Sequence, residues 1–359
     1  MRTIYLIRHC EPDFPDGKRV CLSGGDISLS RLGRMQAVLL RESLPHVDHV
    51  FCSPLARARE TALALAPEVE ARENLRELGM GDWEGLSFAE IRARYPKLYG
   101  ERGKKPFICF PSGAEKPVDC LTRMGYELDS LCQRIQGDFA VVAHAGVNRL
   151  FLCEALKKDR NDFLKLPQPY GCVNMICENG QNLTVWGTGM QPRPVLSPEL
   201  CINLMSAAGT PKPVQEHSCA VAVLADEIGQ SLIKQGYPLN LYLLHSAALL
   251  HDIARTEPQH PKAGSDWLSA LGYPEVGIVI AAHHDLPDEQ DLEINESVIL
   301  YLADKLTQGA IHVTLEERFA LSAKKCASER AKKAHSQRYQ QAKRVENMIK
   351  KAIGTVGEL

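Results

Sequence analysis

Two histidines in the first half of the chain each follow directly on a short apolar run. Arg8 and His9 come after the run 3–7, and His144 comes after the run 139–143. A neutral imidazole at the end of a buried strand can attack phosphorus and carry the phosphoryl group covalently. Arginines offer bidentate donors to phosphate oxygens, and a carboxylic acid can protonate a leaving alkoxide and then activate water. Four segments supply these residue types in chain order: 6–12, 53–62, 75–85 and 142–146.

The second half of the chain places histidine and aspartate within apolar stretches, most clearly at His251-Asp252. This pair is costly inside an apolar helix unless something compensates it, and a metal ion does so. Imidazole and carboxylate suit Fe, Mn, Co, Ni or Zn, and a carboxylate can bridge two ions. Bound metal would acidify a water molecule and hold phosphate oxygens. Five segments carry the candidate ligands: 215–225, 247–255, 260–264, 281–285 and 300–305.

The elements that must position the first set alternate between buried strands and helices. Strands are expected at 3–7, 47–52 and 139–144, and the helices between and after them are expected at 30–44, 56–66 and up to residue 156. This alternation predicts an α/β three-layer domain over residues 1–187, with a mostly parallel sheet covered on both faces. Catalytic groups then lie beyond the carboxyl ends of the strands, where His9 and His144 stand.

The pattern changes after Trp186. Residues 188–197 are rich in glycine and proline, which predicts a linker. Residues 198–359 show helical periodicity without a strand pattern, which predicts an all-α domain. Its helices are expected at 198–208, 212–235, 240–254, 259–271, 274–283, 295–309 and 315–352.

Residues 1 to about 185 resemble the histidine phosphatase superfamily, which has the phosphoglycerate mutase-like fold. The similarity is strongest to the branch with alpha-ribazole phosphatases and broad-specificity phosphatases, and residues 25–37 and 111–115 also fit its pattern. The resemblance implies that His9 is the phosphorylated nucleophile and Glu77 the proton donor. It also implies that Arg8, Arg57 and His144 bind the phosphate, and that no cofactor is needed.

One residue departs from that family pattern, because Cys10 stands where the family has glycine after the nucleophile. Cysteine carries a Cβ and restricts both the backbone dihedrals and close approach. The alternative that Cys10 is itself a nucleophile lacks an activating surround in the sequence. A second alternative is that this domain is a non-catalytic ligand-binding or regulatory module.

Roughly residues 198–310 resemble the HD-domain metal-dependent phosphohydrolases. The ordered ligands H…HD…D of that family correspond to His217, His251, Asp252 and Asp304, and Asp252 is also expected to act in catalysis. His260 and the pair His283-His284 match the additional histidines of relatives with two metal ions.

Several neighbouring residues keep more than one interpretation. His283 and His284 would point about 100° apart on a helix, so one of them can face solvent. Arg255 and Lys305 either reach a substrate phosphate or lie on a solvated helix face, and His245 fits a core or surface position better than a ligand.

Bulk composition excludes some classes of protein. The 359 residues suggest two domains, and a net charge near −2 predicts no overall attraction to nucleic acid or membrane. No apolar run would span a bilayer, and the first residues leave no room for a signal peptide. Twelve cysteines without a Cys-x-x-Cys pair predict buried, reduced thiols in a cytoplasmic protein.

The C-terminal segment 322–351 is rich in lysine and arginine, and Tyr339 is its one aromatic residue. Nucleic-acid binding is not expected, because base stacking needs aromatics, and a solvated helix face is the preferred interpretation.

These observations predict a bifunctional phosphate-ester hydrolase. One site would act on a small phosphorylated metabolite through phosphohistidine. The other would use a divalent transition metal to hydrolyse a nucleotide or a similar small phosphate ester. Neither substrate, nor the oligomeric state, follows from the sequence.

Overall fold

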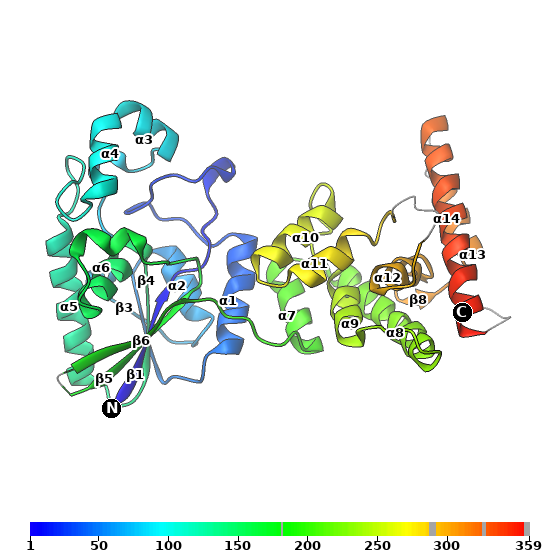
Figure 1. The fold of residues 1–359 in the computed structure, drawn as a ribbon, viewed down its shortest axis with the longest axis horizontal. Coiled ribbons are helices and arrows are strands. Elements are labelled where there is room, and N and C mark those ends of the chain that lie inside the picture. The colour runs from blue at the N-terminus through cyan, green and yellow to red at the C-terminus, as the bar shows by residue number, and fades with distance from the viewer. Residues whose placement is uncertain (181, 287–291, 325–327, 355–359) are drawn as a thin grey trace. The chain divides into compact units, whose positions relative to one another are not determined.

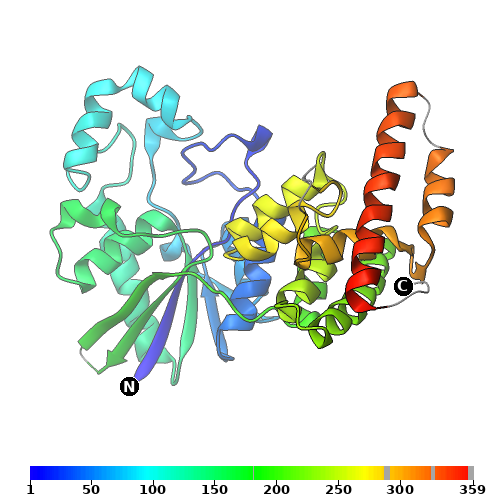
Figure 2. The ribbon, with the colours of Figure 1, turned by 45° about the vertical axis from the view of Figure 1, so that its right-hand side comes forward.

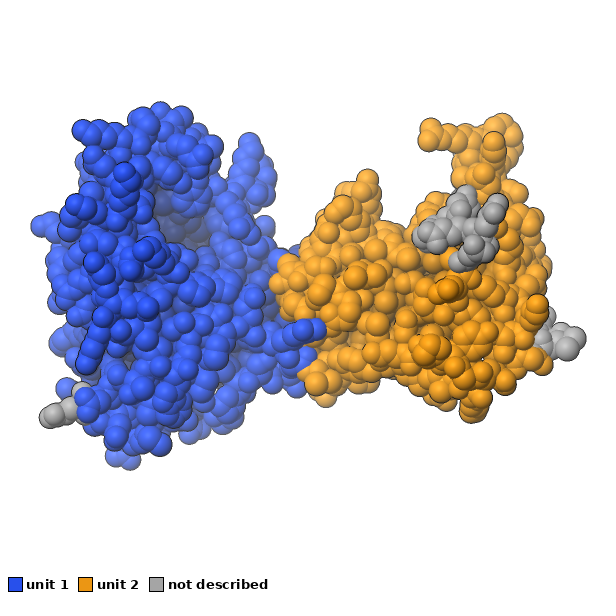
Figure 3. Space-filling view, in the orientation of Figure 1, with its two compact units in different colours: residues 1–194 blue, residues 195–359 orange. Residues whose placement is uncertain are grey.

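The computed structural model describes residues 1–180, 182–286, 292–324 and 328–354. The chain divides into two compact units, residues 1–194 and 195–359 (Figure 3). Among the described residues, every helix is too short or too polar to cross a membrane.

A six-stranded mixed sheet forms the centre of the first unit, with strand order β3-β2-β4-β1-β5-β6 (Figure 1). The first four of these strands run parallel to one another, β5 pairs antiparallel with β1, and β6 pairs antiparallel with β5 at the edge of the sheet. The strands are β1 Arg2–Arg8, β2 His49–Cys52, β3 Glu70–Ala71, β4 Phe139–Ala143, β5 Val173–Asn179 and β6 Asn182–Met190.

Helices cover both faces of this sheet because alternate residues of β1 face opposite sides. Ile4 and Leu6 pack in one apolar core with α5 and α6, whereas Tyr5 and Ile7 pack in another with α1 and α2. The three-layer α/β arrangement is therefore confirmed. The covering helices are α1 Arg31–Ser43, α2 Ala56–Leu63, α5 Pro117–Arg134 and α6 Ala145–Ala155.

A small satellite subdomain packs around Trp83 in the same unit. Its indole lies between the rings of Tyr95 and Tyr99, with centroid distances of 6.3 and 6.1 Å, and Cys21 and Ile91 complete the cluster. The helices here are α3 Phe88–Arg94 and α4 Pro96–Lys104. The short 3-10 turns of the unit are η1 Pro15–Gly17, η2 Glu73–Leu75, η3 Gly81–Trp83 and η4 Arg160–Lys165.

The segment 188–197, predicted to be a linker, is only partly one. β6 runs to Met190, so residues 188–190 belong to the sheet. Gly189 can join it because its backbone N–H donates to the Asn174 side chain at 2.8 Å and its φ is positive. The first helix of the second unit, α7, is capped by the Ser197 hydroxyl.

Helix α9 Leu241–Leu250 is the core element of the second unit. It is mostly apolar and packs against α7, α8, α11 and α12, as expected of a central helix. The remaining elements are α7 Pro198–Ala208, α8 Lys212–Lys234, α10 His260–Ala270, α11 Pro274–Ala281, α12 Glu296–Lys305, β7 Thr307–Gln308, β8 Ile311–His312, α13 Leu315–Ala323 and α14 Glu329–Ile353.

Several predicted helices end earlier than expected, and two of these ends lie at candidate ligands. α9 stops at Leu250, so His251-Asp252 lie in a turn, where Ile253 N–H donates to the Leu250 carbonyl three residues back. α11 stops at Ala281, so the adjacent His283 and His284 are not on a helix. The predicted helix 295–309 ends at residue 305 and continues into the β7–β8 hairpin, and the predicted helix 315–352 is two helices.

Candidate active sites

The first site lies where β1 and β4 end side by side. Arg8 is paired with Ala143 across these parallel strands, and the His9 N–H donates to the Ala143 carbonyl at 3.0 Å. His9 and His144 therefore follow two neighbouring strands at the same edge, and their ring centroids are 5.0 Å apart. The expectation that these two histidines meet rested on their positions at strand ends, and the structure brings them together.

A backbone carbonyl determines the tautomer of His9. Its Nδ1 lies 2.7 Å from the Cys10 carbonyl, an acceptor, so Nδ1 carries the proton and Nε2 has the free lone pair. Burial, together with Arg8 and Arg57, lowers the pKa of His9 well below its ordinary value. The imidazole is therefore neutral near pH 7, which is the state required of a nucleophile.

His144 is fully buried, and neither of its ring nitrogens has a hydrogen-bond partner among the described residues. Burial and the neighbouring His9 lower its pKa as well. A buried, unpaired imidazole is costly unless a ligand pairs with it. An oxyanion held between His144 and the nearby arginines would remove that cost.

Two arginines in this site are held by backbone carbonyls. Arg57 is 1% exposed and donates to the carbonyls of Gly25 and Ser23 at 2.6 and 3.2 Å. Arg8 donates to the Gln168 carbonyl and stacks on Tyr170, with its guanidinium 3.8 Å from the ring centroid. Carbonyls do not neutralise the arginines, so both keep a full positive charge for an anionic ligand.

Glu77 reaches the same site through the N-terminus of α6. Its carboxylate accepts from the backbone N–H groups of Gly146 and Val147, both at 3.0 Å, and from its neighbour Leu78 at 2.8 Å. Together with Arg8, His9 and Arg57 it lines a cavity of about 520 Å³.

We expect Gly146→Ala to reduce the activity of this site roughly 10- to 100-fold, because small displacements of a catalytic group are costly. A Cβ on Gly146 would lie 2.6 Å from a carboxylate oxygen of Glu77 and would push it aside. The measurement is kcat and KM for metal-independent phosphate release. Gly125→Ala on α5 is the matched control, since a Cβ there meets no atom within 4 Å. Equal rates for the two variants would contradict this role of Gly146.

The two buried imidazoles also predict how stability depends on pH. Because folding lowers the pKa of His9 and His144, the unfolded chain binds more protons below its ordinary histidine pKa of about 6.5. Stability therefore falls as the pH drops below about 6.5, by up to about 1.4 kcal/mol per pH unit for each histidine. Urea unfolding at several pH values should show a shallower dependence in His144→Gln. An unchanged dependence would contradict the prediction.

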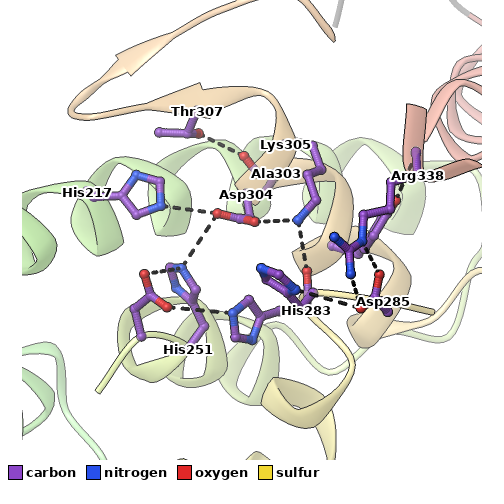
Figure 4. Close-up of polar contacts among 12 residues, drawn as sticks. His217, His251, His283, Asp285, Ala303, Asp304, Lys305, Thr307 and Arg338 are labelled. Atoms are coloured by element: carbon purple, nitrogen blue, oxygen red, sulfur yellow. Dashed lines mark hydrogen bonds and ion pairs between the residues drawn. The ribbon is translucent and has the colours of Figure 1, made fainter. Parts of the chain in front are cut away.

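The second site gathers histidine and aspartate from several separate elements of the helical unit (Figure 4). Two groups of side chains each bring their ligand atoms within 4.8 Å of one another, and Asp252 belongs to both. The first group is His217, His251 and Asp252, and the second is Asp252, His260 and His283.

Asp304 on α12 adjoins the first of these groups. Its Oδ1 lies 3.1 Å from Nε2 of His217 and 3.8 Å from Nε2 of His251. Burial raises the pKa of Asp304, but Lys305 and His217 outweigh that effect, and the pKa lies well below its ordinary value. The carboxylate is therefore ionised and suited to a cation.

Backbone carbonyls orient three of the histidines in the same way. Nδ1 of His217, His251 and His283 lies 2.9, 2.8 and 2.6 Å from the carbonyls of residues 309, 248 and 280. Each Nδ1 therefore donates to its carbonyl, which turns each Nε2 toward the aspartates of the site, as in histidines that bind metal.

The donor set of this site fits a divalent transition metal. Nε2 of His251 is buried and has no hydrogen-bond partner among the described residues, and burial lowers the pKa of His251 to about 4. A neutral imidazole whose lone pair has no partner, next to the ionised carboxylate of Asp252, is an arrangement suited to binding a metal ion. An ion held there would pair with the His251 lone pair.

Of the seven candidate ligands, Asp304 and His284 belong to neither group. Asp304 adjoins the first group through His217, whereas His284 lies further out. Its side chain is 45% exposed and its Nδ1 lies 3.7 Å from Asp285. His260, by contrast, lies 3.2 Å from Asp252 Oδ1. His245, expected to be a core or surface residue, pairs with Asp226 at 2.7 Å, and it belongs to neither ligand group.

Comparison with known families gives the context for both sites. The sequence profile of the histidine phosphatase superfamily (branch 1) matches residues 4–187, just over half of the chain. The chain belongs to the histidine phosphatase superfamily. The profile of the HD domain matches residues 214–309. Both parts therefore belong to hydrolase families, and the chain is a hydrolase.

Individual relatives are similar to part of the chain. Phosphoserine phosphatase 1 of Hydrogenobacter thermophilus is 29% identical over 182 residues, which are 48% of this chain and 83% of that protein. A probable phosphatase of Schizosaccharomyces pombe is 39% identical over 110 residues, which are 27% of this chain and about half (52%) of that protein.

One of the solved structures similar to this chain shows the same fold. A mycobacterial hydrolase covers 58% of this chain and 97% of its own length, with a TM-score of 0.50 and 24% identity. An alpha-ribazole phosphatase from Shigella flexneri covers 54% of this chain and 100% of its own, with a TM-score of 0.47 and 23% identity.

In this member of the histidine phosphatase superfamily, Cys10 turns away from the site. Its side chain is buried against Leu29 and Ala37 and does not line the cavity. Its φ is not positive, so the backbone here has no requirement for glycine. Burial raises the pKa of its thiol to about 12, which leaves no thiolate for nucleophilic attack.

Glu84 is a supporting residue of the superfamily site that residue types and spacing did not single out. Its carboxylate accepts from the backbone N–H groups of Ser23, Gly24 and Gly25, at 2.9 to 3.0 Å. This clamp holds the loop whose carbonyls bind Arg57. The segment 75–85 contains Glu84, but only the folded loop shows what it contacts.

Proposed function

We propose that the chain is a bifunctional phosphate-ester hydrolase. The histidine phosphatase unit would hydrolyse a small phosphomonoester through phosphohistidine, without a metal. The HD unit would be a metal-dependent phosphohydrolase that acts on a nucleotide or another small phosphate ester.

In the first unit, Nε2 of His9 attacks phosphorus and displaces the alkoxide. Arg8, Arg57 and His144 hold the non-bridging oxygens and stabilise the charge of the transition state. Glu77, which lines the same cavity, protonates the leaving oxygen. The resulting carboxylate then takes a proton from the water that cleaves phosphohistidine, and His9 is restored.

The hydrogen bond between Nδ1 of His9 and the Cys10 carbonyl carries this half of the proposal. It leaves the lone pair of a neutral imidazole on Nε2, in a cavity that Arg8 and the buried Arg57 also line. The alternative of a non-catalytic module was based on Cys10, and the buried position of that side chain, away from the cavity, speaks against it.

In the second unit, His217, His251, Asp252 and Asp304 would hold one ion, and Asp252, His260 and His283 would hold a second. Fe, Mn, Co, Ni or Zn suits these donors, and such an ion would supply an acidified water and polarise the phosphate. Lys305 donates to Asp304 at 2.7 Å and to the His283 carbonyl at 3.2 Å, so it orients a ligand and keeps its charge near the site. The carrying observation is that Asp252 is shared by both ligand groups.

A phosphate-release screen over phosphomonoesters and nucleotides tests both halves at once, if each compound is assayed with added metal and with a chelator. The proposal requires one activity that survives the chelator and another that needs metal. A chain in which every activity responds to the chelator in the same way would contradict two independent sites.

A further inference from the structure

The cavity over the HD site has a wall that the HD domain itself does not supply. Its volume is about 440 Å³, and it is lined by Asp252 and Asp304 together with Arg318 of α13 and Arg338 of α14. Both helices begin after residue 309, where the match to the HD domain ends. The basic C-terminal segment, expected to be only a solvated helix face, therefore contributes to a candidate active site.

The two helices form a packed hairpin and lie side by side in both ribbon views (Figures 1 and 2). Lys343 joins them, with its Nζ 2.6 Å from Glu316 and 2.9 Å from Glu346. At the cavity, the Ser322 hydroxyl lies 2.8 Å from Nε2 of His335. These contacts hold α13 and α14 together, so the wall that they form is a packed part of the second unit.

Arg338 fastens α14 to the segment that carries His283. Its Nε and Nη2 donate to the two carboxylate oxygens of Asp285 at 2.5 and 2.9 Å (Figure 4). The Tyr301 hydroxyl donates to the Arg338 carbonyl at 3.4 Å. Arg338 is therefore a positioning residue, because its guanidinium forms an ion pair with the Asp285 carboxylate.

The cationic side chains that line the cavity differ in whether they have an ion-pair partner. Apart from Asp252 and Asp304, every charged residue among its described lining is cationic. Lys305 pairs with Asp304, Arg255 lies 3.5 Å from Asp252, and Arg338 pairs with Asp285. Arg318, in contrast, makes no side-chain hydrogen bond or ion pair with the described residues.

We propose that Arg318 binds a second phosphate group of the substrate, so that the HD site prefers esters with two phosphate groups over monophosphates. This inference rests on the proposed function of the HD unit. Asp252, Asp304 and Arg318 line the same cavity, so a substrate whose scissile phosphate is held at the ligand groups would also present its other groups to the guanidinium of the α13 wall. A guanidinium binds a phosphate through two parallel hydrogen bonds. A monophosphate whose one phosphate is held at the ligand groups has no second phosphate to form these bonds with Arg318.

The test compares adenosine 3′,5′-bisphosphate with adenosine 5′-monophosphate, which share one nucleoside and differ by one phosphate. Every protein is the full chain with His9→Ala, which silences the first site, and Mn²⁺ is present. Initial rates of phosphate release give kcat and KM, and calorimetry gives Kd. Arg318→Ala should weaken the bisphosphate at least about tenfold in KM or Kd and the monophosphate less than about twofold.

Two further variants interpret that result. Arg318→Lys keeps the charge and should retain part of the preference, which separates binding from misfolding. Lys333→Ala, at an exposed position of α14 that does not line the cavity, should retain all of it. An equal effect of Arg318→Ala on both compounds, or none on either, would overturn the inference.

The two proposals fail in different ways. If neither compound releases phosphate in a metal-dependent manner, the function proposed for the HD unit loses its support. Calorimetry then still decides the inference, since a preference for the bisphosphate in the His9→Ala protein that the added Arg318→Ala removes would support it. The absence of such a preference in the His9→Ala protein with Arg318 intact would overturn it.

Discussion

Replacing His9 by alanine should abolish the metal-independent phosphatase activity, with a loss of at least about a thousandfold in kcat, because no covalent intermediate can form. The measurement is phosphate release in the presence of a chelator, with any small phosphomonoester that the wild-type chain hydrolyses. A second readout is the acid-labile phosphate trapped on the protein during turnover. Wild-type protein should acquire this label, and His9→Ala should not.

Two controls make this prediction specific. His46→Ala removes an exposed histidine of the same unit, 83% exposed at its side chain, and should leave the rate unchanged. Cys10→Ala removes the adjacent thiol, which is buried away from the cavity, and should retain activity within about threefold, as expected for a residue without a chemical role. Full activity in His9→Ala, or its loss in Cys10→Ala alone, would reject His9 as the nucleophile.

Replacing Asp252 by alanine should remove bound metal and the chelator-sensitive activity together, with a rate loss of about a thousandfold or more. The physical reason is that this one carboxylate belongs to both ligand groups. Its removal also takes away the negative charge that lies among the neighbouring imidazoles. Elemental analysis of the purified protein and phosphate release with added metal are the two measurements.

The variant His217→Ala distinguishes one shared site from two separate ones. His217 belongs to the first ligand group only, so its loss should leave part of the bound metal, whereas Asp252→Ala should leave none. Asp266→Ala is the matched surface control, because its carboxylate is 62% exposed and pairs only with Lys262 in α10. Metal content and activity that persist in Asp252→Ala would overturn the assignment.

Much of the first site could be predicted from local sequence. Apolar runs before His9 and His144 indicate buried strands, and parallel strands of one sheet end at the same edge. That both histidines lie at one edge of the sheet therefore follows from pattern, whereas the pairing of β1 with β4, which makes them neighbours, is a feature of the fold. The contacts of Glu77 could not be predicted, because the charged segment in which it lies does not indicate which residues its side chain will contact. Only the fold brings its carboxylate to the N–H groups of Gly146 and Val147.

Helix boundaries in the second unit were predicted less well. The apolar run around residues 240–254 predicts one continuous helix, yet α9 ends at Leu250. Periodicity cannot detect such an end, because the turn at His251-Asp252 is stabilised by packing and by hydrogen bonds of the folded unit. As a result, His251 and His283 reach the site from turns, each with its Nδ1 on a carbonyl three residues back.

By itself the sequence determined the two-part organisation, the residue types of both sites and the strand ends that hold His9 and His144. These features depend on local pattern, and local pattern survives without long-range contacts. Tertiary structure alone decided the direction of the Cys10 side chain, the tautomers of the buried histidines, the sharing of Asp252 between two ligand groups, and the place of Arg318 beside them. Each of these is a contact between residues whose separation in the chain, or whose orientation, no spacing rule encodes.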